Sequence, residues 1–101
     1  MASVGHRIER TGGETVLLFD GEIDLSNARD VRGVILEALA KAPSLAVDLS
    51  AVRYMDSSGV ANLIEGFQKA RAGKKGFRVA NPSEPVRLVL RMAKLEKILV
   101  G

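Results

Sequence analysis

The regular alternation of strand-like and helix-like segments most restricts how this 101-residue chain can fold. Two short runs with apolar residues, at 6–10 and 15–21, flank the sequence TGGE, and this pattern predicts a β-hairpin. The helices and strands predicted after it alternate, at 26–43, 44–52, 58–73, 76–81 and 84–95. The order β-β-α-β-α-β-α has the spacing of βαβ units. It predicts an α/β fold with a mostly parallel sheet and one antiparallel edge region.

Residue types at the helix ends and faces predict how the first two helices are placed. Ser26 is a plausible N-cap for the first helix, and Gly73 is a C-cap signal for the second. One apolar stripe in the second helix predicts its buried face, and it consists of Val60, Leu63, Ile64 and Phe67.

The C-terminal part of the sequence leaves alternatives open. Leu88 and Met92 fall one turn apart beside the inward stripe of the third helix, so they are either the margin of the core or a contact patch. The margin of the core is the favoured interpretation. Residues 96–100 form a possible final strand.

Composition and the N-terminus exclude several classes of site and location. The chain has no cysteine, which removes disulfides and cysteine-based metal or redox sites and fits a reducing compartment. No apolar run approaches the roughly 18 residues of a membrane span, and the N-terminus lacks the apolar region of a signal peptide. We therefore expect a cytoplasmic protein that is not inserted in a membrane.

Charge is distributed unevenly along the chain. Residues 1–50 hold 5 Lys/Arg and 8 Asp/Glu, which gives −3, and residues 51–101 hold 10 and 4, which gives +6. The basic half could attract nucleic acid, anionic lipid or an acidic protein surface. Because aromatic residues make up only 4% of the chain and no recognition motif is present, we do not expect nucleic acid as a partner.

The sequence YMDSSG at 54–59 raises the question of a serine nucleophile, but the rest of an enzyme is missing. A hydrolase elbow needs G-x-S-x-G, and the three residues directly before the serines, Tyr54 to Asp56, include no glycine. The only histidine, His6, lies on the first predicted strand, and no motif links it to the serines. The acidic run at 20–24 opens like a calcium loop, but Leu25 stands where that loop needs glycine. No dinucleotide or P-loop motif is present, so no enzyme, cofactor or metal site is predicted.

Ser57 and Ser58 stand at the start of the second predicted helix, where two roles are open. Serine is a favoured N-cap, worth about 1 kcal/mol. The unpaired N–H groups and the helix dipole also favour an anion, so a phosphate on either serine would be accommodated, while Asp56 would make the same patch acidic. Extending the helical stripe backwards places Ser57 near the buried edge and Ser58 toward solvent.

A resemblance to a known family lies in three segments, FDGEIDLSNA at 19–28, LAVDLSAVRYMDSSGVANLIEGFQKARAGKKGFRVAN at 45–81 and VRLVLRMAKLEKILV at 86–100. They resemble the STAS domain, specifically the bacterial anti-sigma factor antagonists. The resemblance covers almost the whole chain and implies a single STAS-like domain over 1–101. It also implies a mostly parallel mixed sheet of four to five strands with an opening hairpin, and three to four helices packed mainly on one side.

The same resemblance implies a function in transcription regulation by partner switching. In that family the unmodified antagonist binds an anti-sigma factor with serine kinase activity, which frees the sigma factor. The kinase phosphorylates the antagonist with ATP, and a metal-dependent serine phosphatase reverses the modification. The antagonist is then a substrate and not an enzyme.

Site residues follow from the resemblance by position. The modified hydroxyl is the one directly after the motif aspartate, which is Ser57, with Ser58 as second choice. The implied partner-binding residues are Asp24, Asp56, Ser57, Ser58 and Gly59. We expect a monomer or weak dimer. The alternative is a STAS subunit of an ABC-type lipid transporter that binds its ATPase, and the intact serine pair argues against it.

Overall fold

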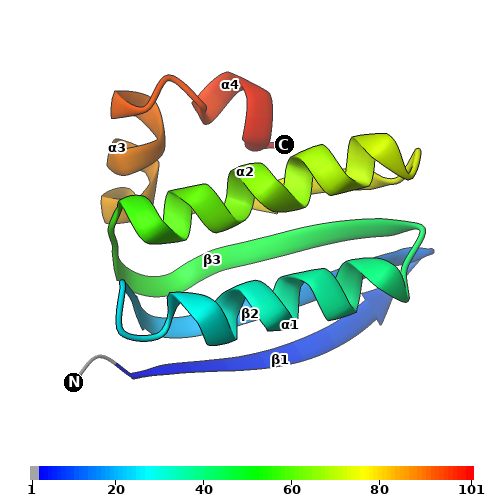
Figure 1. Cartoon of the computed structure of the whole chain (residues 1–101), viewed down its shortest axis with the longest axis horizontal. Coiled ribbons are helices and arrows are strands. Elements are labelled where there is room, and N and C mark those ends of the chain that lie inside the picture. Colours follow the sequence, from blue (N-terminus) through cyan, green and yellow to red (C-terminus); the bar gives the residue numbers. More distant parts are fainter. Residues whose placement is uncertain (1–2) are drawn as a thin grey trace.

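A computed structural model describes residues 3–101 of the chain (Figure 1). Its strands are β1 (Val4–Thr11), β2 (Glu14–Ile23), β3 (Ser44–Met55) and β4 (Gly76–Ala80). Its helices are α1 (Ala28–Ala40), α2 (Ser57–Ala72), α3 (Glu84–Met92) and α4 (Glu96–Leu99). The predicted order of strands and helices is confirmed up to α3.

The strands form one mixed sheet in the order β1-β2-β3-β4. β1 pairs antiparallel with β2 through a hairpin whose turn residues, Gly12 and Gly13, have φ of 56° and 88°. Positive φ at both central positions is the geometry of the turn that matches strand twist, and glycine adopts it without steric cost. β2 pairs with β3 and β3 with β4 in parallel. The predicted hairpin and mostly parallel sheet are confirmed.

The helices pack mainly on one side of this sheet, as Figure 1 shows for α1 and α2, which run side by side across it. Every second residue of β3 faces them, and Leu45, Val47 and Leu49 are completely buried there. Ile35 of α1 and Leu63 of α2 complete this layer of the core. α3 packs against β3 at the end of the sheet where α2 begins.

The possible final strand at 96–100 is wrong, because Glu96–Leu99 forms the short helix α4. Only Val100 makes a bridge to the sheet, parallel to Val79. Glu96 accepts hydrogen bonds from Arg87 and Arg91 of α3, and these bonds turn the segment back toward α3 before it can extend along β4.

The first helix begins later than predicted. Ser26 is not its N-cap, because that position is held by Asn27, which makes no side-chain cap hydrogen bond. The Ser26 hydroxyl donates instead to Asp24 at 2.6 Å. This side-chain hydrogen bond to Asp24 competes with helix capping, so Ser26 does not cap the helix.

The buried face of α2 is rotated relative to the predicted stripe. Val60 and Leu63 are buried as expected, whereas Ile64 and Phe67 are only half-buried. The remaining buried positions are small or polar, namely Gly59, Asn62, Gly66 and Ala70. Because these residues are small or polar, α2 can pack closely against the sheet and against α1. The pattern of apolar residues does not predict that these positions are buried.

Candidate functional site

The turn that starts α2 is built around the side chain of Asp56. Its Oδ1 accepts from the backbone N–H of Ser58 at 2.9 Å and from the Ser58 hydroxyl at 2.5 Å. Its carbonyl accepts from the N–H groups of Gly59 and Val60 at 3.1 and 3.2 Å. Asp56, and neither serine, is therefore the N-cap of the helix.

The two serines have different surroundings as a result. Ser57 is exposed, and its hydroxyl makes no hydrogen bond to any residue in the described range 3–101. Ser58 is half-buried, with its hydroxyl held by Asp56. The backward extension of the helical stripe gave the opposite order and is wrong, because the capped turn folds the residue two positions after the aspartate back onto it.

The loop between β2 and α1 is tied to this turn through the same carboxylate. The Leu25 N–H donates to Asp56 Oδ2 at 3.3 Å, and the Asp56 N–H donates to the Ile23 carbonyl at 3.2 Å. Asp24 accepts from the backbone and hydroxyl of Ser26 within this loop. A shallow hollow results, lined by Asp24, Leu25, Ser26, Tyr54 and Asp56.

Two glycines allow the loops to meet. Gly21 has a φ of 98°, and a Cβ there would run into the Ser3 carbonyl, so the β2 bulge beside it requires glycine. A Cβ on Gly59 would lie 2.6 Å from Met55 Cγ and 3.0 Å from Ile23 Cγ2. Gly59 is buried, so it does not contact a partner directly. It can contribute to a partner interface only by letting the first turn of α2 pack closely against Met55 and Ile23.

The carboxylate at the centre of the site is held in its ionised form. The hydroxyl of Ser58 lowers the pKa of Asp56, and the N–H groups of Ser58, Gly59 and Leu25 lower it further against the opposing effect of partial burial. Asp24 lies at the same hollow. The surface around Ser57 therefore carries fixed negative charge at neutral pH.

Apolar side chains that the sequence did not single out for the site border the same hollow. Leu25 is 81% exposed and Tyr54 is 49% exposed. Both residues lie in the sequence close to the acidic residues of the motif, and this proximity is a signal that could have identified them.

Leu88 and Met92 on α3 are also exposed. The core-margin interpretation of these two residues is therefore wrong, because the short helix α3 buries only Val86 and Leu90.

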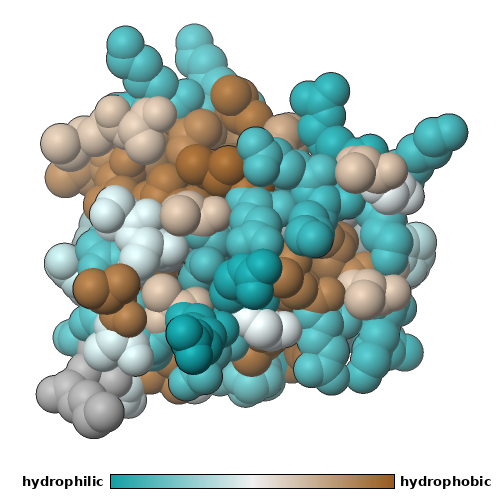
Figure 2. Space-filling view, viewed as in Figure 1, coloured by the Kyte–Doolittle hydropathy of each residue, from teal (hydrophilic) through white to brown (hydrophobic). Residues whose placement is uncertain are grey.

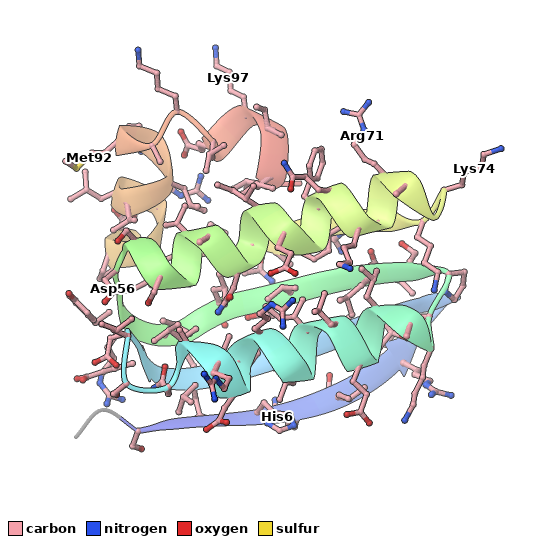
Figure 3. All side chains as sticks on the ribbon, viewed as in Figure 1. His6, Asp56, Arg71, Lys74, Met92 and Lys97 are labelled. Atoms are coloured by element: carbon pink, nitrogen blue, oxygen red, sulfur yellow. The ribbon has the colours of Figure 1, made fainter. Side chains whose placement is uncertain are left out.

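The residues weighed for catalysis and metal binding lie apart or lack partners. His6 is on edge strand β1, with its ring 6.1 Å from that of Phe19 (Figure 3). Within residues 3–101, no three His, Cys, Asp or Glu side chains are grouped as a metal site would need. None of the helices in this range combines the length and apolar character that a bilayer span requires.

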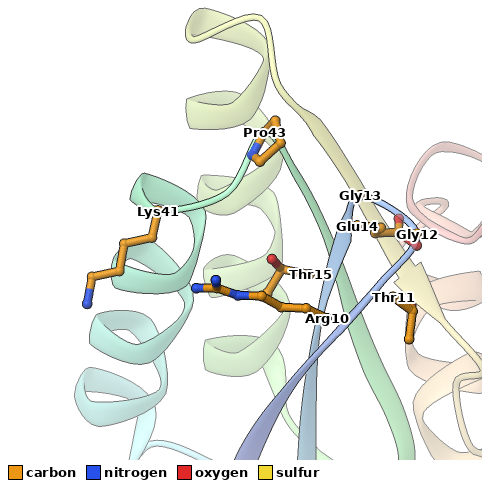
Figure 4. A pocket seen from close by; sticks show the side chains of 8 residues that line it. All are labelled: Arg10, Thr11, Gly12, Gly13, Glu14, Thr15, Lys41 and Pro43. Atoms are coloured by element: carbon orange, nitrogen blue, oxygen red, sulfur yellow. The ribbon is translucent and has the colours of Figure 1, made fainter.

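A second hollow lies at the opposite end of the sheet, beside the β1–β2 turn (Figure 4). Arg10 and Lys41 line it together with Glu14. The Glu14 carboxylate is engaged by Arg78 through two hydrogen bonds, at 2.8 and 3.0 Å. The Glu14 carboxylate is therefore already paired, and none of the residues that line this hollow belongs to the motif around Ser57. The end of the molecule with Ser57 is the better candidate site.

Comparisons with known proteins agree with this geometry. A family model described as "Mlab, STAS domain" matches residues 6–101. An anti-sigma factor antagonist from Mycobacterium paratuberculosis has a similar structure, with a TM-score of 0.87, 28% identity, and coverage of 96% of this chain and 83% of that one. SpoIIAA in its unphosphorylated form has a TM-score of 0.79 at 22% identity, with coverage of 95% and 86%. The phosphorylated form of SpoIIAA from Bacillus has a TM-score of 0.72 at 22% identity, with coverage of 95% and 89%.

The fold thus defines the class of this protein, a small α/β domain of the kind found in anti-sigma factor antagonists. The family model covers nearly the whole chain. This chain belongs to the STAS domain family.

Proposed function

We propose that this protein is an anti-sigma factor antagonist controlled by phosphorylation of Ser57. In its unmodified form it binds an anti-sigma factor with serine kinase activity, so that the sigma factor is released. Phosphorylation ends this interaction, and a metal-dependent serine phosphatase restores it. One observation carries the proposal: in a STAS domain, the exposed Ser57 hydroxyl has no hydrogen-bond partner among residues 3–101 and lies beside the ionised cap of α2.

The different surroundings of the serines support Ser57 as the acceptor. In phosphoryl transfer the hydroxyl oxygen attacks the γ-phosphorus of ATP, its proton passes to a base of the kinase, and ADP leaves. Ser57 can present its oxygen to a kinase without breaking a hydrogen bond to any residue of the described part of the chain, 3–101. Ser58 would first have to break its hydrogen bond with Asp56, and its phosphate would then lie against that carboxylate.

The surroundings of the hollow support a protein partner. Leu25 and Tyr54 offer apolar area at the hollow that Asp56, the residue before Ser57, also lines. Aromatic residues at the centre of an interface often contribute much of the binding energy. Asp24 and Asp56 add carboxylates that can accept hydrogen bonds from donor groups of the partner. Both kinds of contact would surround the hydroxyl that is to be modified.

Charge is the proposed means of release. A phosphate adds about −1.5 to −2 units to a surface that already carries two carboxylates. The cap hydrogen bonds of Asp56 involve backbone groups that a phosphate on Ser57 does not need to displace. The first turn of α2 can therefore keep its conformation, while the phosphate adds repulsion against a partner carboxylate that lies close to Ser57 in the unmodified complex.

Phosphorylation assays on paired variants test this function. Purified Ser57→Ala and Ser58→Ala proteins are incubated with the cognate anti-sigma factor and labelled ATP. We expect Ser57→Ala to remain folded and to lose labelling, and Ser58→Ala to keep most of it. Full labelling of Ser57→Ala together with loss in Ser58→Ala would identify the other hydroxyl as the acceptor. Binding to a transporter ATPase, with no labelling of either serine, would support the alternative transporter role instead.

A further inference from the structure

An apolar groove runs between α2 and α4, away from the turn that carries Ser57. It has a volume of about 410 Å³. Its residues are Ile64, Phe67, Gln68, Arg71, Leu95, Ile98 and Leu99. Ile98 is 56% exposed, and Phe67 is half-buried at the margin of the core. The rotation of α2 that buries its small residues is what leaves Ile64 and Phe67 on this flank.

Cationic side chains stand at the groove and next to it. Figure 2 shows hydrophilic side chains that project along this edge of the molecule, and Figure 3 labels two cations that project outward there, Arg71 on α2 and Lys97 on α4. Arg71 lines the groove, with its guanidinium 5.7 Å from the centre of the Phe67 ring, and Lys97 lines a separate hollow with Lys94 and Glu96. Lys74 and Lys94 extend the basic surface, and none of these four side chains takes part in an ion pair within residues 3–101.

The acidic residues on these segments are already engaged. Glu65 pairs with Arg32 of α1 at 2.7 Å. Glu96 pairs with Arg87 and Arg91 of α3 at 2.8 and 3.5 Å. No other acid occurs in 64–75 or 94–99, so the positive charge of the rim is available to a ligand.

We propose that this groove is a docking site for an acidic amphipathic helix of a partner protein. From Ile64 to Arg71 the groove follows α2 for about 10 Å, which matches the span of apolar anchors at i, i+3, i+4 and i+7 on a bound helix. Acidic residues flanking those anchors would meet Arg71 and Lys97. A hollow of this kind receives a ridge of side chains, whereas a flat lipid surface would leave it unfilled.

This docking site is separate from the proposed phosphorylation site. Phe67 lies ten residues after Ser57, which is about 15 Å along the helix axis. The two surfaces also differ in charge, since the Ser57 end carries carboxylates, whereas the groove has Arg71 in its lining and Lys97 on the adjacent α4. The inference therefore does not depend on the proposed function, and a partner in the groove could remain bound while Ser57 is modified.

A peptide titration tests the proposal. The probe is a synthetic 14-residue helical peptide with leucines at i, i+3, i+4 and i+7 and glutamates flanking them, added to the isotope-labelled full chain and followed by NMR. Its controls are the same peptide with lysines in place of the glutamates, and a scrambled acidic peptide. We expect saturable binding of the acidic helix only, with shifts concentrated at Ile64, Phe67 and Ile98.

Matched variants locate the interaction on the protein. Ile98→Asp should weaken binding about ten-fold through lost apolar area and added repulsion, and Lys97→Glu, a surface change that leaves the core intact, should weaken it about five-fold. Leu88→Asp alters an exposed apolar residue outside the groove and should leave binding unchanged. Ser57→Asp should also leave it unchanged.

Several results would overturn the proposal. They are equal binding of the basic or scrambled peptide, no saturable binding of the acidic peptide, and wild-type affinity in Lys97→Glu. Binding of the chain to phosphatidylserine vesicles without binding of the peptide would assign the surface to lipid. Concentration-dependent self-association lost in Ile98→Asp, again without peptide binding, would assign it to a second copy of the chain.

Discussion

Removal of the Asp56 side chain should loosen the candidate site and measurably destabilise the whole domain. In the native protein this carboxylate caps α2 through Ser58 and also holds the loop before α1 through the N–H of Leu25. Asp56→Ala removes both connections. Asp56→Asn is the matched variant, because its single amide oxygen can still cap the helix but cannot accept all of these hydrogen bonds at once.

The size of the effect follows from the hydrogen bonds that are lost. Loss of the N-cap costs about 1 kcal/mol. The bonds to the Ser58 hydroxyl and the Leu25 N–H add about 1 kcal/mol together, because both lie near the surface and the second is long at 3.3 Å. Asp56→Ala should thus destabilise the domain by about 2 kcal/mol, which lowers Tm by roughly 10 °C in a domain of this size. Asp56→Asn should lose about half as much.

Thermal unfolding followed by circular dichroism between pH 3 and pH 7 checks both the size and the cause. Because the folded pKa of Asp56 is lowered, its stabilisation is fully present above the pKa of the unfolded chain, about 3.9, and is lost as pH falls through the folded pKa. The gap between wild type and Asp56→Ala should therefore narrow in acid. A gap under 2 °C at neutral pH, with wild type and variant otherwise folded, would refute the role given to this carboxylate.

Three further predictions concern helix ends, packing and charge. Lys74 and Lys94 follow α2 and α3 with φ of 57° and 62°, so Lys74→Gly and Lys94→Gly should each raise the free energy of unfolding by about 0.5–1 kcal/mol in urea titrations. Gly59→Ala should lower it by about 1–3 kcal/mol, since the new Cβ meets the Met55 side chain in a tightly packed contact; unchanged stability would mean that this contact relaxes freely. Phosphorylation of Ser57 should weaken partner affinity by about 2–3 kcal/mol, or roughly 30- to 150-fold, at moderate salt, and calorimetry at rising ionic strength should show this gap shrinking. A gap that salt does not change would point to steric exclusion.

The sheet could be predicted because it depends on local signals that nothing else contradicts. The apolar run of β3 and the Gly12–Gly13 turn each specify one local geometry, and pairing of the strands follows from their order. The helix faces were less predictable. In α2, Gly66 packs against Phe77 and Asn62 is buried by donating to the Ala28 carbonyl, and both depend on partners far away in the sequence.

The local structure of the site depends on a side-chain turn that occurs at three places in the chain. Asp24, Asp48 and Asp56 are each followed two positions later by a serine, and each aspartate accepts from both the N–H and the hydroxyl of that serine. This D-x-S signal was present in the sequence and would have predicted Asp56 as the cap. It would also have indicated that the middle residue, Ser57, points outward.

The C-terminal segment could not be placed from its apolar residues alone. The pattern ILV at 98–100 suits a strand, but the ion pairs of Glu96 with α3 hold this part of the chain in a helical turn. Those pairs join residues whose proximity becomes apparent only once α3 is positioned against β3. The groove beside α4 was for the same reason not predictable from the sequence.

Mass spectrometry of the protein purified from its native cells tests the proposed function most directly. Cleavage after Arg53 and Lys69 releases the segment 54–69, and fragment ions that separate Ser57 from Ser58 locate any phosphate within it. We predict a single phosphate on Ser57, present in a fraction of the molecules and absent from the fraction that copurifies with an anti-sigma factor. A phosphate on Ser58, or an unmodified segment in protein that copurifies with an ATPase and a permease, would contradict the proposal.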